Sequence, residues 1–221
     1  MLKILLLLLL STVAFADDDN SNHHQIDFQT TESIKIDNDV MRVTMQIIVV
    51  DEDINTVTNS INKRSHTIKN IAQNFNVKLK TTNYHTNPQY HKKAIKNWRG
   101  IYAFSIESKN FEQVTKALKK LQKVANYQSV RFLVSTKKRQ QAYNQLLVAA
   151  ISAHQQRGKN IALNFGSKTY QFKQTNFDQQ RIQPSRNSYN MKMSLSADVA
   201  PAFSAGESSV NITINSTIEL R

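Results

Sequence analysis

Two periodicities of apolar residues divide most of the chain into strands and helices. Apolar residues at every second position predict strands, which lie at 31–50 (a pair), 77–81, 101–106, 130–134, from Tyr170, 191–199 and 210–220. Apolar residues three, four or seven apart predict helices at about 52–75, 111–125 and 138–165. This order predicts an α+β protein with mixed or antiparallel sheets, about three amphipathic helices and a long β-hairpin in the middle.

Local signals refine these elements. Acidic residues at 51–53 are placed to cap the first helix, and Gly166 stands where the third helix should end. Gly158 is expected to weaken or kink that helix. The alternation of the last strand is expected to slip once between Ile214 and Ile218, and residues 174–190 are polar and predict a loop.

The central hairpin, at about 79–106, carries the candidate interaction residues. Pro88 is expected to end its first strand, and 92–99 is expected to form a basic loop at the tip. Exposed tips rich in aromatic and basic residues favour interfaces. The candidate interaction residues are Tyr84, Tyr90, Lys92, Lys93, Lys96, Trp98 and Arg99.

Chemistry-bearing motifs are missing from the sequence. There is no cysteine, and the four glycines are too far apart for a Rossmann or Walker loop. HExxH and GxSxG are also absent. His85 and His91 flank the hairpin tip and could share a metal, but no carboxylate nearby completes such a site. We therefore predict no catalytic residue, no cofactor and no metal site, and we expect His154 on the surface or at a subunit contact.

The N-terminus has the pattern of an export signal. Lys3 precedes an unbroken apolar run, and Ala14-Phe15-Ala16 forms an A-x-A cleavage site. The run is shorter than a bilayer-spanning helix. The sequence thus predicts a signal peptide at 1–16, a disordered arm at 17–27 and an α+β domain at 28–221, which is either single or made of two subdomains. No later segment is long enough to be a transmembrane helix.

The charge is strongly positive and unevenly distributed. The formal net charge is +13, and residues 78–139 hold fifteen Lys or Arg against Glu107 and Glu112 alone. A basic surface attracts anionic polymers and membranes. Export disfavours nucleic acid as a partner and favours anionic lipid, lipopolysaccharide or an acidic protein. The alternative interpretation is that these basic residues form only a solvated surface and bind no partner.

The order of motifs resembles the SIMPL domain family, bacterial proteins of the periplasm that are in part associated with the outer membrane. The matching marks are the Asn87-Pro88-Gln89-Tyr90 element, the aromatic strand from Gly100 to Phe104, the strand around Ser129–Phe132, and the end of the alanine-bearing helix at Leu163–Gly166. The resemblance covers most of 28–221. It implies a non-enzymatic protein, because members have no established catalytic residues. It also implies self-association, since some members form rings, and a role in envelope or oxidative stress.

Three hypotheses follow for the function. The first is an exported, non-enzymatic envelope protein that acts through self-assembly as a homo-oligomer and through protein interaction. The second is a basic module that binds anionic envelope polymers or lipids. The third is a metal-dependent or hydrolytic enzyme, which rests only on scattered His, Asp and Ser residues.

Overall fold

The structure is a computed structural model that describes residues 24–178 and 204–221. The expected signal peptide at 1–16 and the expected strand at 191–199 lie outside the described residues, as does the expected loop beyond residue 178. Within the described residues the chain forms three helices and seven strands, arranged in two antiparallel sheets. The predicted α+β class with three helices and a long central hairpin is confirmed.

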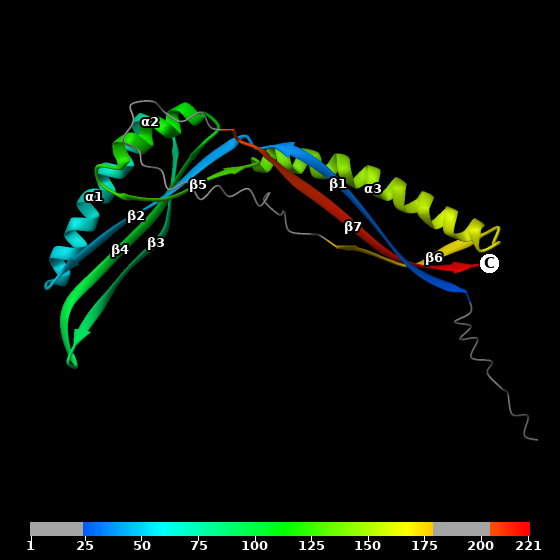
Figure 1. Ribbon diagram of the computed structural model, residues 1–221, viewed down its shortest axis with the longest axis horizontal. Helices are drawn as coiled ribbons and strands as arrows, with labels where there is room; N and C mark the ends of the chain where they lie inside the picture. The colour runs from blue at the N-terminus through cyan, green and yellow to red at the C-terminus, as the bar shows by residue number, and fades with distance from the viewer. Residues whose placement is uncertain (1–23, 179–203) are drawn as a thin grey trace, which may run out of the picture.

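One half of the molecule is a three-stranded sheet with a long helix along one face (Figure 1). The strand order is β1 (Gln25–Asp37), β7 (Glu207–Leu220), β6 (Tyr170–Asp178). The helix is α3 (Thr136–Asn164), whose buried residues recur at every fourth position. They are Ala142, Leu146, Ala150, His154, Gly158 and Ala162.

Gly158 makes room for aromatic rings and does not serve as a breaking point within α3. A Cβ at this position would stand 3.2 Å from Phe172 and 3.3 Å from Phe28. The helix runs unbroken from Thr136 to Asn164, so Gly158 does not end it. Gly166 follows with φ of +74°, and its N–H donates to the carbonyl of Leu163, which confirms the predicted helix stop.

The other half is a four-stranded sheet covered by two helices. Its strand order is β3 (Lys78–His91), β4 (Ala94–Ser108), β2 (Val40–Asp51), β5 (Asn126–Leu133). Helices α1 (Ile54–Asn74) and α2 (Phe111–Leu121) pack on the face that carries the buried alternate residues of β2 and β4. The Asp53 carboxylate accepts from the N–H groups of Asn55 and Thr56, so the predicted acidic cap of α1 is confirmed.

Asp39 joins the two halves. It stands in the turn between β1 and β2, and its carboxylate accepts from the N–H (2.6 Å) and the hydroxyl (2.7 Å) of Ser135, where β5 passes into α3. The Lys109 ammonium lies 2.9 Å from the same carboxylate. Partial burial opposes ionisation of Asp39, but Lys109 and the two Ser135 donors outweigh it and lower its pKa to about 2.

Two expectations about the hairpin are wrong. Strand β3 continues through Pro88 to His91, because it is an edge strand and a proline there can turn its nitrogen away from the neighbouring strand. The expected basic loop at 92–99 is a two-residue turn of Lys92 and Lys93, since β4 already begins at Ala94. Both turn residues have positive φ, as a type I′ hairpin turn requires.

Strand ends also differ from the expectations at two other places. Residues 25–27, expected in the disordered arm, belong to β1 because each pairs with β7. Residues 174–178, expected in a loop, belong to β6 because they pair with 213–217 of β7. In both segments, backbone pairing with a distant strand outweighs a polar local sequence.

Candidate functional site

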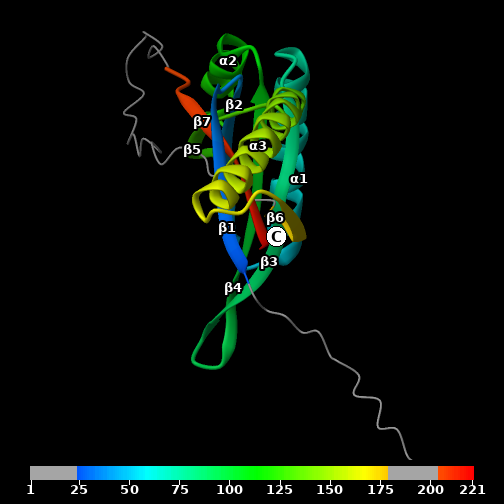
Figure 2. The ribbon, with the colours of Figure 1, turned by 90° about the vertical axis from the view of Figure 1, so that its right-hand side faces the viewer.

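The β3–β4 hairpin extends past the other elements (Figures 1 and 2). The last residue of β2, Asp51, lies opposite Trp98, so beyond that point β4 pairs with β3 alone. A two-stranded ribbon is marginally stable on its own. This end of the hairpin therefore has both faces available to a partner.

An aromatic–aliphatic pair is exposed on this ribbon. Tyr90 and Ile95 lie directly opposite each other, and they are 67% and 47% exposed. Lys92, Lys93 and Lys96 are exposed beside them. Tyr90 and the three lysines were predicted from the sequence. Ile95 was not, because it was expected in a loop and not on a strand opposite a tyrosine.

The other three candidate residues lie farther from the tip. Trp98 is half-buried against the core of the four-stranded sheet, so its expected place on the exposed tip is wrong. Tyr84 is 48% exposed and meets the edge of Tyr102 at a ring-centre distance of 6.1 Å. Arg99 pairs with Val50 and is exposed.

His85 and His91 do not approach each other. Both lie on β3, six residues apart, which corresponds to roughly 20 Å along a strand. His85 contacts Asn83 instead, with 3.2 Å between Nδ1 and Oδ1. The described residues contain no group of three His, Cys, Asp or Glu placed to hold a metal ion.

The four-stranded sheet has a basic open face, meaning the face turned away from α1 and α2. Cations from all four strands occupy it, and they are Arg42, Lys78, Lys80, Arg99 and Arg131. Glu107 lies among them and pairs with Arg42 (2.6 Å) and Lys78 (3.5 Å). Ile48 and Ile101 pair toward the hairpin end of this face, next to the exposed Val50. The face thus combines several cations with a small apolar patch at one end.

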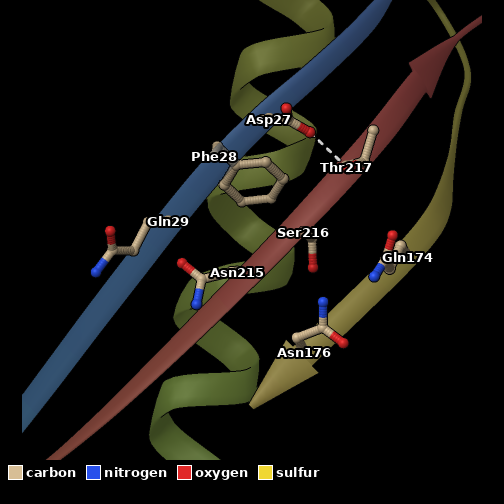
Figure 3. A pocket seen from close by; sticks show the side chains of 8 residues that line it. All are labelled: Asp27, Phe28, Gln29, Gln174, Asn176, Asn215, Ser216 and Thr217. Carbon is tan, nitrogen blue, oxygen red and sulfur yellow. Dashed lines mark hydrogen bonds between the residues drawn. The ribbon is translucent and has the colours of Figure 1, made fainter. Parts of the chain in front are cut away.

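The three-stranded sheet has an open face of different chemistry, turned away from α3. A pocket of about 380 Å³ lies there, and all three strands contribute to it (Figure 3). Its lining residues are Asp27, Phe28, Gln29, Gln174, Asn176, Asn215, Ser216 and Thr217. Four are side-chain amides and one is an acid that accepts a hydrogen bond from the Thr217 hydroxyl. No pattern in the sequence predicted this pocket.

A β-bulge in β6 aims two of the amides at the pocket. Phe172 lies opposite Ile218, but the next pairing is Gln174 with Thr217, so Lys173 is the extra residue. Bulges of this kind re-aim the side chains that follow them. The shift turns Gln174 and Asn176 to the open face and Thr175 to the helix face.

A buried polar cluster lies on the opposite side of this sheet, against α3. The ring of His154 is 3% exposed, with Nδ1 2.9 Å from the Thr30 hydroxyl and Nε2 2.7 Å from the Ser216 hydroxyl. Ser216 in turn donates to Thr175. The ring stacks on Phe28 at a centroid distance of 4.4 Å. Burial lowers the pKa of His154, and the charge of Arg157 adds to this effect.

This cluster corrects two expectations. His154 is buried, and not on the surface, because Phe28 and the hydroxyls of Thr30 and Ser216 enclose it. The expected slip in the last strand is absent, because Ser216 keeps the alternation between Ile214 and Ile218. Ser216 stands at a position where the alternation expects an apolar residue, and this was the sequence signal of a buried side chain that makes a hydrogen bond.

The fold and these surfaces define a class: an α+β protein with two helix-backed sheets, two open sheet faces of contrasting charge, and a protruding hairpin. Among the described residues no helix is long and apolar enough to cross a membrane. The chain belongs to the SIMPL family, a family described as "protein of unknown function (DUF541)", whose model matches residues 26–218. A comparison with curated proteins found no match. The family expected from the motif order is confirmed.

Proposed function

We propose that the protein is an exported, non-enzymatic component of the bacterial envelope that acts by self-association through the β3–β4 hairpin, in a role connected with envelope or oxidative stress. The observation that carries the self-association is the exposed Tyr90–Ile95 pair on the two-stranded ribbon. Packing this pair on a second copy removes apolar surface from water, and the surrounding lysines keep the assembly soluble.

The chemistry of the described residues supports the non-enzymatic part of the proposal. The arrangement most similar to a nucleophile and its base is Ser216 with His154. Both are buried, at 6% and 3% exposure, and a threonine hydroxyl stands where a triad would have an acid. This pair packs a helix on a sheet, and the serine hydroxyl is already engaged in hydrogen bonds with His154 and Thr175.

Substitution of the exposed pair tests the proposal. Tyr90→Ser combined with Ile95→Ser should shift the protein to later elution on size exclusion, with an unchanged circular dichroism spectrum because neither side chain is buried. Val148→Ser is the matched control, since Val148 is 71% exposed but lies on α3. Equal elution of the double variant and the wild type would refute the role of the hairpin.

A second candidate function is the binding of an anionic envelope polymer or lipid by the basic open face. The five cations of that face outnumber its acid, Glu107, among the described residues. Lys80→Glu with Arg99→Glu should then weaken retention on anionic lipid vesicles, and high salt should release the wild-type protein. Lys119→Glu with Lys120→Glu, on α2, is the charge-matched control. If both double variants lose retention equally, the attraction is one of net charge and the face has no special role.

A further inference from the structure

We propose that the pocket on the open face of the three-stranded sheet is a binding site for a neutral, hydroxyl-rich ligand, namely a carbohydrate of one or a few sugar units. This inference is independent of self-association, because the pocket lies on the half of the molecule that does not contain the hairpin. Its volume of about 380 Å³ is within the range of small-molecule sites.

The hydrogen-bonding groups of the lining match sugar hydroxyls. Each side-chain amide offers two donors and a carbonyl acceptor, and a hydroxyl group both donates and accepts. Within the described part of the chain, the side-chain amides of Gln174, Asn176 and Asn215 make no hydrogen bond. Their donors and acceptors are therefore available to a ligand. Gln29 makes one contact, a donation to Thr31 at 3.3 Å.

The charge of the pocket argues against an anionic ligand. None of its eight lining residues is Lys, Arg or His, and Asp27 contributes a negative charge. A phosphate or sulfate would meet this carboxylate without a compensating cation. The contrast with the basic open face of the other sheet is direct, so the two faces select different partners.

The pocket is also built on a rigid frame. Its polar side chains project from three hydrogen-bonded strands, and the bulge at Lys173 fixes the direction of Gln174 and Asn176. Sites on regular elements hold their groups more precisely than sites on loops. On the opposite face of the sheet the Phe28 ring stacks on His154, so the strand that carries Asp27 and Gln29 is packed against α3.

Calorimetric titration with defined sugars tests the proposal. The probes are glucose, maltose, N-acetylglucosamine and its β-1,4-linked tetramer, each up to millimolar concentration. At least one should bind saturably and independently of salt. Equal affinity for monomer and tetramer would indicate that the ligand of the pocket is a free sugar. Tighter binding of the tetramer would indicate that the ligand is an envelope glycan chain.

Variants of exposed amides connect such binding to the pocket. Gln174→Ala with Asn215→Ala should weaken it about tenfold, as expected for the loss of two hydrogen bonds. Asn211→Ala is the control, because Asn211 lies on the same face of β7 but does not line the pocket. The proposal is overturned if no probe binds, if the double variant binds as the wild type does, or if inorganic phosphate competes for the site.

Discussion

His154 keeps its two buried hydrogen bonds as a neutral ring. Ser216 donates its proton to Thr175, so it accepts a hydrogen bond from Nε2–H of the ring, and Nδ1 accepts from the Thr30 hydroxyl. Protonation would place a charge between aromatic rings and close to Arg157. Burial and this neighbouring charge lower the pKa of His154 below its value in an unfolded chain.

The pH dependence of stability follows from this shift. Below about pH 6.5 the unfolded chain takes up a proton at His154 while the folded protein resists it, so the free energy of unfolding decreases as the pH falls. Urea unfolding at several pH values measures the effect. His154→Ala should lower stability by about 1–3 kcal/mol at neutral pH and should flatten the profile between pH 6.5 and 5. His66→Gln, at an exposed position of α1, should keep the wild-type profile, and an unchanged slope in His154→Ala would contradict the account.

At the scale of elements, the hairpin turn places two consecutive non-glycine residues at positive φ. Lys92 and Lys93 have φ of +44° and +67°, a region in which type I′ turns strongly prefer Asn and Gly. This strained turn lies at the outer end of the two-stranded ribbon. No third strand pairs with the ribbon there to stabilise it. This end of the hairpin should therefore open more readily than the part next to β2.

Replacing the turn tests that conclusion. Lys92→Asn with Lys93→Gly should slow hydrogen exchange of the amides at 89–97 about fivefold, the equivalent of about 1 kcal/mol. Lys119→Asn with Lys120→Gly places the same pair in helix α2, where both residues lower helix stability, so exchange there should become faster. Unchanged exchange at 89–97 would show that the lysines adopt the turn without strain.

Periodicity predicts elements well where local pattern and packing agree. The α1 cap at Asp53 and the end of α3 at Gly166 are local signals, and both are confirmed. Pro88 and residues 174–178 were misjudged because strand pairing with distant residues determines their state. Ser216 was read as a slip because its partner, His154, lies 62 residues away.

At the scale of the whole molecule, the open faces of the two sheets carry the distinctive chemistry. The pocket combines residues 27–29 and 215–217 with Gln174 and Asn176, and the direction of these two β6 amides depends on a bulge that no local sequence pattern predicts. The pocket could therefore not be predicted from local sequence patterns. The basic character of 78–139 was visible in the sequence, but the grouping of four of its cations with Arg42 on one sheet face depends on the strand order β3–β4–β2–β5.

The molar mass of the wild-type protein in solution, measured by light scattering over a micromolar concentration series, tests the central proposal most directly. We expect a mass that is a multiple of a single chain and that falls toward one chain when Tyr90 and Ile95 are both replaced by serine. A wild-type mass equal to one chain throughout the series would contradict self-association as the working state of the protein.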